Sequence, residues 1–137
     1  WYVVGEAYGP CATADALSEM IAPLIDRWQP RVIVTDTNFP MTSNQLRRGG
    51  LPIHDADKRP GSVADGIRAV QQLFASGLLA VDEQACPNTW RDLSSYRWAT
   101  DAHGASLDRP DKVNDHACDA LRYVVAYATG RRRLLFS

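Results

Sequence analysis

Short apolar runs alternate with amphipathic stretches along this chain of 137 residues. The apolar runs are rich in β-branched residues and predict strands, whereas the amphipathic stretches repeat apolar residues at the three- and four-residue intervals of a helix. The predicted strands are, in order, residues 1–6, 31–36, 51–54 and 78–82. Strands that alternate with helices favour an α/β fold in which helices cover a sheet.

The predicted helices carry start and stop signals. Residues 17–28 form an apolar stripe, with Thr13 as a candidate N-cap. Ser62 and Asp65 match the S-x-x-D capping box at the start of a second helix, and Gly77 is a typical residue to end it. Further helices are predicted at residues 43–48, 89–98 and 114–130, and the Asp-, Gly- and Ser-rich residues 100–112 predict a long loop.

Composition narrows the class of protein. The chain is 45% hydrophobic and 23% charged, which is typical of one globular domain and excludes collagen-like and wholly disordered chains. The apolar runs are too short to span a bilayer. Fifteen basic and 16 acidic residues give a net charge of -1, so an anionic partner must be bound locally. Three cysteines without a C-x-x-C pair argue against a disulfide framework and favour a reducing cytoplasm.

Three aspartates form a candidate metal site. Asp115 and Asp119 are four residues apart in the predicted last helix, where two like charges repel unless a cation lies between them. The alternative, favoured by the helix alone, is that Asp115 interacts with the helix dipole and that Asp119 is either solvated or paired with Arg122. Asp36 ends a predicted strand, where ligands bind in open α/β sheets, although an aspartate there is also typical of a turn. Carboxylates without His or Cys suit Mg²⁺ or Mn²⁺, not Zn²⁺.

The order of these features resembles the nuclease domain of the large terminase subunit of tailed phages, which has an RNase H-like (RuvC-like) fold. The segments that carry the resemblance are VVGEAYG, IVTDTN, LRRGGLPI, ADKRPGSVADGIRAV, GLLAVD, WRDLSSYRW and DHACDALRY, and they span nearly the whole chain. The resemblance implies an α/β fold with an RNase H-like mixed sheet flanked by helices. It also implies an ATPase motor upstream and hydrolysis of DNA by two metal ions that carboxylates hold.

The resemblance also assigns roles to acidic residues. Asp36 matches the second catalytic acid of the family, and Asp119, in the D-A-L-R-Y core, matches the third; Asp115 is expected to be a further ligand or an orienting residue. The first predicted strand resembles the third strand of the family, and Glu6 on it is not the missing first acid. We therefore expect the first two strands to be absent and residues 1–137 to be a C-terminal nuclease fragment of low activity.

The remaining expectations concern the residues that bind DNA, the metal ions and the partner molecules. Lys58, Arg59, Arg47 and Arg48 are predicted to contact DNA phosphates, and so are residues 131–133, with a solvated surface charge as the alternative for each. The resemblance implies Mg²⁺ or Mn²⁺, two ions in the complete domain. The implied partners are double-stranded DNA, the ATPase domain, the small terminase subunit and the portal, without a membrane, in the cytoplasm of the bacterial host.

The implied activity is endonucleolytic cleavage of concatemeric double-stranded DNA. Two other classes of protein fit the same residues. One is a RuvC-like junction resolvase or transposase-type nuclease, and the other is a non-catalytic module that docks on DNA or on the portal.

Overall fold

A computed structural model describes residues 1–111, 113 and 115–135, with the backbone alone for residues 106, 108, 109 and 131–135. Its helices are α1 (Ala14–Trp28), α2 (Pro40–Arg48), α3 (Ser62–Ala75), α4 (Pro87–Ser95) and α5 (His116–Leu135). Its strands are β1 (Tyr2–Val3), β2 (Ile33–Thr35), β3 (Ile53–Asp55), β4 (Ala80–Val81), β5 (Trp98–Thr100) and β6 (Ser106–Pro110). No helix in the described part of the chain is long and apolar enough to cross a membrane.

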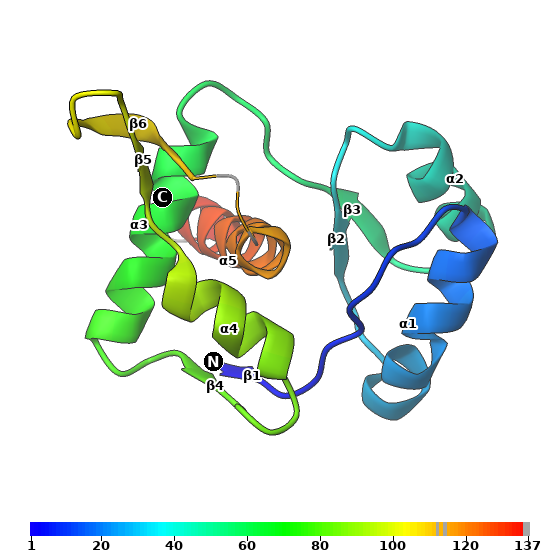
Figure 1. Ribbon diagram of the computed structural model, residues 1–137. Helices are drawn as coiled ribbons and strands as arrows, with labels where there is room; N and C mark the ends of the chain where they lie inside the picture. The colour runs from blue at the N-terminus through cyan, green and yellow to red at the C-terminus, as the bar shows by residue number, and fades with distance from the viewer. Residues whose placement is uncertain (112, 114, 136–137) are drawn as a thin grey trace.

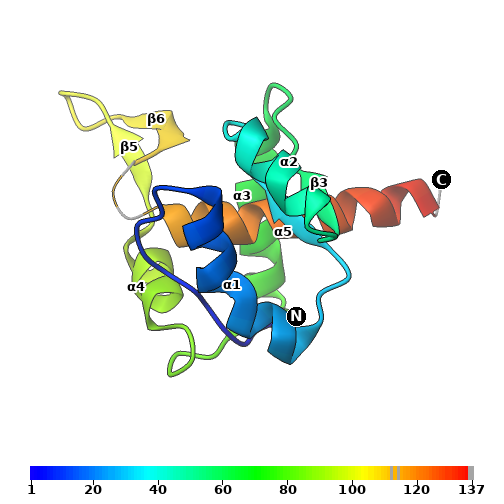
Figure 2. The same ribbon diagram turned by 90° about the vertical axis from the view of Figure 1, so that its right-hand side faces the viewer.

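The last helix occupies the centre of the molecule. Helices α3 and α4 lie on one side of α5, and the unit made of α1, α2, β2 and β3 lies on the other (Figure 1). Figure 2, seen from the side of α1 and α2, shows the C-terminal end of α5 extending beyond them. Both parts of the molecule are therefore organised around one helix.

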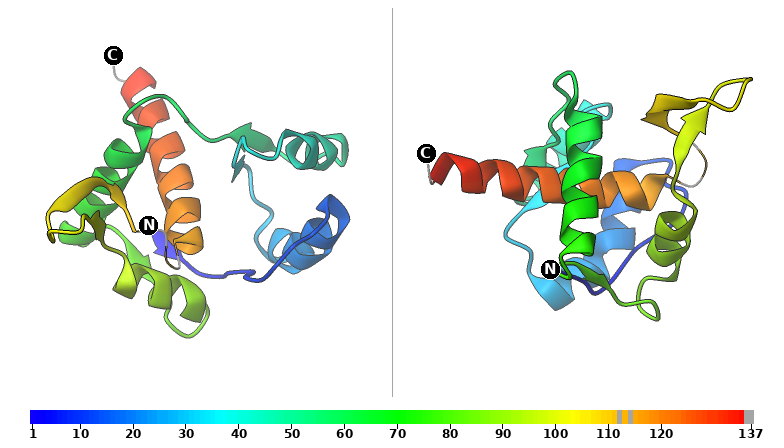
Figure 3. Two further views of the ribbon diagram at one scale, coloured as in Figure 1. Left: turned by 45° about the horizontal axis from the view of Figure 1, so that its top comes forward. Right: turned by 90° about the vertical axis from the view of Figure 1, so that its left-hand side faces the viewer.

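Helix α3 crosses α5, as Figure 3 shows, and the core forms at this crossing. It contains Val70 of α3, Leu79 before β4, and Leu121 and Val125 of α5, and each of these side chains is at most 9% exposed. Burying an aliphatic side chain of this size contributes about 1.5–3 kcal/mol to folding. This contact fixes the position of α5, which carries the predicted aspartates.

The strands form three separate pairs within the described residues. Strand β1 pairs with β4 and β2 pairs with β3, both in parallel, while β5 and β6 are antiparallel. An apolar groove of about 990 Å³ lies between β1, α1, the start of β2 and the first turns of α5. The predicted α/β architecture is confirmed, but β1 and β2 do not share a continuous sheet.

Two of the three predicted helix signals are confirmed. The Thr13 hydroxyl accepts a hydrogen bond from the first turn of α1, and Gly77, at φ 67°, follows the end of α3. The predicted capping box is wrong. Gly61, at φ 83°, is the N-cap of α3, Ser62 is its first residue, and the Asp65 carboxylate pairs with arginines instead. Glycine at a positive φ brings the chain into α3 without a side-chain cap.

The predicted long loop at residues 100–112 is also wrong, because these residues contain the turn and the second strand of a β-hairpin. Helix α4 ends at Ser95, and Trp98, predicted to be helical, begins β5. One carboxylate oxygen of Asp101 accepts two backbone N–H groups of the turn, and Gly104 adopts φ 82° there. These local bonds close the hairpin. The last helix is longer than predicted, and its predicted first residue, 114, lies outside the described residues.

Glu6 holds the segment after β1 against the start of α4. Its Oε1 accepts from the backbone and side-chain N–H groups of Asn88, and its Oε2 accepts from the backbone N–H and hydroxyl of Thr89, all at 2.8 Å. Burial acts to raise the pKa of Glu6, but these four hydrogen bonds outweigh it and lower the pKa. Glu6 thus satisfies N–H groups that the first turn of a helix leaves without partners.

Replacing Glu6 with Gln should lower the free energy of unfolding by about 1–2 kcal/mol at pH 7, because one amide oxygen cannot accept all four donors. The folded-state pKa of Glu6 lies below 4.5, so the charge contributes its full stability above that pH. The difference between the wild type and Glu6→Gln should therefore shrink as the pH falls through the folded-state pKa. Urea denaturation at several values between about pH 3 and pH 7 measures this difference in the free energy of unfolding.

The matched control is Glu19→Gln, which removes an exposed carboxylate from α1. It should leave the stability unchanged across the same pH range. Equal stabilities of the wild type and Glu6→Gln at pH 7 would show that the Glu6 carboxylate does not cap α4.

Candidate active site

Asp36 follows the last residue of β2 and reaches α5. Its Oδ1 accepts from the backbone N–H of Asn38 at 2.8 Å and from the Lys58 ammonium at 2.9 Å. Its Oδ2 accepts from the hydroxyl of Tyr123, on α5, at 2.9 Å. The end of the strand therefore meets the last helix, and Tyr123 lies one helical turn after Asp119.

Lys58 completes a triangle with these two residues. It belongs to the segment between β3 and α3, and its ammonium donates to the Tyr123 hydroxyl at 2.7 Å. The same ammonium lies 4.7 Å from the centroid of the Tyr123 ring, a cation–π contact. Asp36, Lys58 and Tyr123 are thus joined pairwise by hydrogen bonds.

Asp36 and Lys58 both remain charged in this triangle. Burial acts to raise the pKa of Asp36, but the hydrogen bonds from Asn38, Lys58 and Tyr123 outweigh it and lower the pKa. Burial acts to lower the pKa of Lys58, but its bonds to Tyr123 and Asp36 outweigh that and raise it. Asp36 is therefore a carboxylate and Lys58 an ammonium at neutral pH.

Asp119 has a cationic partner of its own. Its Oδ1 accepts from Nε and Nη2 of Arg122 at 3.1 and 2.8 Å, which confirms the predicted ion pair. The Arg122 guanidinium also lies 4.5 Å from the centroid of the Tyr123 ring. Tyr123 therefore contacts the cations that neutralise Asp36 and Asp119.

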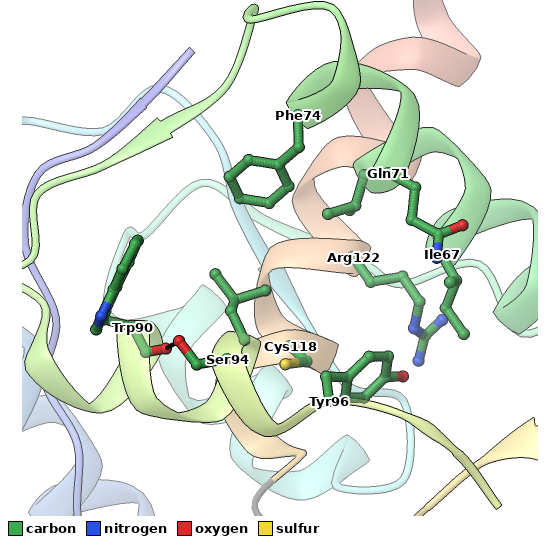
Figure 4. Close-up of a pocket in the computed structure, with 10 residues that line it drawn as sticks. Ile67, Gln71, Phe74, Trp90, Ser94, Tyr96, Cys118 and Arg122 are labelled. Atoms are coloured by element: carbon green, nitrogen blue, oxygen red, sulfur yellow. Dashed lines mark hydrogen bonds between the residues drawn. The ribbon is translucent and has the colours of Figure 1, made fainter.

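Gly66 leaves the space that Arg122 occupies. A Cβ at Gly66, on α3, would overlap Cγ of Arg122 and lie 2.9 Å from its Cδ. Figure 4 shows the Arg122 side chain extending toward Ile67 and Tyr96 at one end of a pocket of about 330 Å³. Arg122 is 5% exposed, so its position is fixed by packing as well as by charge.

The structure places Asp115 differently from the sequence prediction. Asp115 lies just before α5, not within it, and its backbone oxygen accepts the N–H of Asp119 at 2.8 Å. A carboxylate at this end of a helix interacts favourably with the helix dipole. This is the alternative role that the sequence left open for Asp115.

A complete metal site is not formed by the described residues. Among them, no group of three or more His, Cys, Asp or Glu side chains could hold a metal ion. Asp36 and Asp119 are also already paired with cations, at 2.9 and 2.8 Å. The described residues as arranged here therefore do not fit a metal ion by themselves, and metal binding by Asp36, Asp115 and Asp119 stays a prediction.

The predicted DNA-binding residues lie in different surroundings. Lys58 is engaged at Asp36, Arg59 pairs with two aspartates and Arg47 with one, whereas Arg48 has no ion pair within the described residues. The side chains of residues 131–133 lie outside the described residues. Ion pairs between exposed side chains add little to stability, so those of Arg59 and Arg47 can exchange for phosphates.

Two residues of the site were not singled out from the sequence. Tyr123 carries a signal, because it follows Asp119 by four residues and therefore shares its helix face. The sequence signal at Gly66 is weaker. Glycine within a helix is less stable than alanine by about 1 kcal/mol, so its presence there indicates a packing constraint. The reason, contact with Arg122, is visible only in the folded chain.

Comparison with known proteins identifies the family. The family described as Terminase RNAseH like domain matches residues 1–127. The large terminase subunit of Escherichia phage T5 is 30% identical over 128 residues, which cover 90% of this chain and 28% of that protein. This chain therefore spans only about a quarter of the length of that relative.

Solved structures show the same fold. The large terminase nuclease domain from bacteriophage SPP1 with bound Mn has a TM-score of 0.74 at 23% identity, covering 89% of this chain and 67% of that one. The large terminase from a thermophilic bacteriophage has a TM-score of 0.72 at 28% identity, covering 84% of this chain and 28% of that one. The fold is thus RNase H-like, as predicted. This chain belongs to the family of terminase RNase H-like domains.

Replacing Gly66 with Ala should lower the free energy of unfolding by about 1–3 kcal/mol, because the added methyl group overpacks the contact with Arg122. Alanine in a helix otherwise adds stability. The matched control is Gly130→Ala on α5, where nothing lies within 4 Å of the added Cβ. The control should gain about 0.5–1 kcal/mol. Urea denaturation compares the two, and an equal gain in both would show that Arg122 does not pack on Gly66.

Proposed function

We propose that this chain is the nuclease part of a phage terminase large subunit and cleaves concatemeric double-stranded DNA with divalent metal ions. The observation that carries the proposal is the contact of Asp36, at the end of β2, with the face of α5 that bears Asp119. Two carboxylates from distant parts of the chain are thereby brought to one face of one helix. Family membership and the Mn bound to the SPP1 nuclease domain support the same function.

The proposed metal ligands are Asp36 and Asp119, with Asp115 as a further or orienting ligand. Carboxylate oxygens are suited to Mg²⁺ or Mn²⁺, and we propose two ions in the complete domain. Both aspartates remain reachable from solvent, because their side chains are 28% and 34% exposed. The ions would neutralise charge on the DNA phosphate during hydrolysis.

We further propose that two more strands, one with an acidic residue, belong in the groove between β1 and β2. Each of these strands has one partner in the described residues, so each has an unpaired edge, and apolar side chains line the groove. About a third of the SPP1 nuclease domain has no counterpart in this chain, which leaves room for such strands. The additional acid would complete the set of metal ligands.

The other proposed partners follow from the relatives. The large terminase from a thermophilic bacteriophage was solved in complex with ATP-gamma-S, which supports an ATPase domain in the same polypeptide. We propose the small terminase subunit and the portal as protein partners, in the cytoplasm of the bacterial host. Lys58, Arg59, Arg47 and Arg48 would contact DNA phosphates and so position the duplex without reading its sequence.

A non-catalytic docking module is the second candidate. The observation that favours it is that Lys58 and Arg122 already neutralise Asp36 and Asp119. Such a module would bind DNA or the portal without needing a metal ion. A resolvase or transposase-type nuclease of the same fold is less favoured, because the family match is to terminases.

The nuclease proposal is tested with a polypeptide that joins this chain to its natural upstream sequence. It should nick supercoiled plasmid DNA in Mn²⁺, and Asp36→Asn or Asp119→Asn should slow nicking more than about 100-fold, because each removes a metal ligand. The 137-residue chain alone should cut slowly or not at all. Circular dichroism checks that the variants are folded.

The matched control is Asp26→Asn, which removes an exposed carboxylate from α1 and should leave nicking unchanged. Wild-type rates in both active-site variants would place the site elsewhere. Metal-independent DNA binding without any nicking by the wild type would instead support the docking module.

A further inference from the structure

Three consecutive apolar side chains are exposed at the start of α2, shortly after Asp36. Phe39 is 66% and Met41 is 85% exposed, and Pro40 between them is exposed as well. Outside the apolar groove, no other large apolar side chain among the described residues is as exposed as these two. Single exposed apolar residues are normal, but a run of three on a surface indicates a functional contact. We call residues 39–41 the apolar tip.

Hydrogen bonds hold the apolar tip beside Asp36. The backbone N–H of Asn38 donates to Oδ1 of Asp36 at 2.8 Å, and the N–H of Phe39 donates to the backbone oxygen of Asp36 at 3.4 Å. The backbone oxygen of Phe39 accepts the N–H of Ser43 at 3.1 Å. Ser43 is buried, and its hydroxyl lies 2.9 Å from that of Thr35 in β2. The tip therefore has a defined position relative to the candidate site.

The surroundings of the apolar tip suit nucleic acid better than protein. Residues 37–50 contain two arginines and no Asp or Glu, in a chain whose net charge is -1. The exposed side chains that follow the tip on α2 are Asn44, Gln45 and Arg48, and Gln45 donates to Asp15 of α1. Asn, Gln and Arg are residue types that contact DNA phosphates. A protein interface of standard size has a wider apolar centre than three side chains.

We propose that the apolar tip is a wedge that enters a base step of duplex DNA from the minor groove, beside the backbone that contacts the candidate site. This inference rests on the proposed function, because it requires DNA at Asp36. Phe39 lies three residues after Asp36, so a duplex that contacts this site is within reach of the tip. Phe, Met and Pro side chains that enter a base step unstack it and kink the duplex.

The wedge makes DNA flexibility a basis of selection. Unstacking costs least at pyrimidine–purine steps such as TA, whereas A-tracts are stiff. Contacts of the basic residues with phosphates carry no sequence information directly. A preference for flexible steps therefore distinguishes a wedge from a surface that binds the backbone alone.

The fluorescence of 2-aminopurine tests the wedge, because this base fluoresces more strongly when it is unstacked. The polypeptide is the one that carries the natural upstream sequence, and EDTA in the buffer keeps the DNA intact. The wild type should raise the fluorescence of a short duplex that carries 2-aminopurine at its TA steps. The double variant Phe39→Ala/Met41→Ala should not raise it at saturation, and it should bind about tenfold more weakly, as the loss of a stacking contact does.

A binding comparison gives the second readout. The wild type should bind a TA-rich duplex several-fold more tightly than an A-tract duplex of equal length, and the double variant should bind both equally. The matched control is Leu78→Ala, which removes an apolar side chain that is 58% exposed between α3 and β4. It should change neither readout. Arg48→Ala should weaken binding but keep the rise in fluorescence at saturation, because it removes a phosphate contact only.

The outcomes separate this inference from the proposed function. If the double variant binds and unstacks DNA as the wild type does, the wedge is wrong, while the nicking experiment with Asp36→Asn decides the proposed function independently. Weaker binding by the double variant, without unstacking by the wild type, would show an ordinary surface contact and also overturn the wedge. If the wild type does not bind DNA, both proposals are overturned. Unstacking and a TA preference that the double variant loses and Leu78→Ala keeps support the wedge.

Discussion

The hydroxyl of Tyr123 is the interaction on which the candidate site depends. It donates to Asp36 and accepts from Lys58, so it joins the end of β2 and the segment before α3 to the last helix. The ring of the same residue also contacts the guanidinium of Arg122, the partner of Asp119. The packing of α5 on α3 therefore positions Tyr123 and Asp119 for contact with the segment that follows β2 and carries Asp36.

Two acidic residues, Asp92 and Glu6, hold elements of the fold in place through their hydrogen bonds. Asp92 is fully buried and accepts from the Tyr8 hydroxyl, from Arg91 and from the N–H of Ala117, so it fixes the start of α5. Glu6 does the same for α4 through four hydrogen bonds. A buried carboxylate with all its acceptors used has a structural role, because exchanging its partners would leave donors unsatisfied. Asp36 and Asp119 are both partly exposed, so a cation from solvent can reach them.

Local patterns predicted α1 to α5 and β1 to β4, but they missed the hairpin of β5 and β6. The apolar run that ends at Asp36 and the helical stripe around Asp119 placed these residues at the end of a strand and in the last helix, and the ion pair with Arg122 was the alternative role of Asp119. What the patterns missed depends on contacts between distant segments. Gly61, not Ser62, caps α3, and Asp115 precedes α5 instead of lying within it. The triangle of Asp36, Lys58 and Tyr123 joins residues up to 87 positions apart, and spacing cannot show it.

The groove beside α5 lies next to β1 and β2, and each of these strands has only one strand partner in the described residues. A parallel pair is normally buried on both faces and is not stable alone, so an open edge beside an apolar groove is a surface that protein should cover. Large apolar side chains that remain exposed gather there, namely Trp1, Tyr2, Val4 and Trp28. Exposed clusters of this kind mark surfaces that bind protein. Strands placed in the groove, as proposed, would lie next to β2, whose last residue precedes Asp36, so the proposed strands would cover this apolar surface and lie close to that carboxylate.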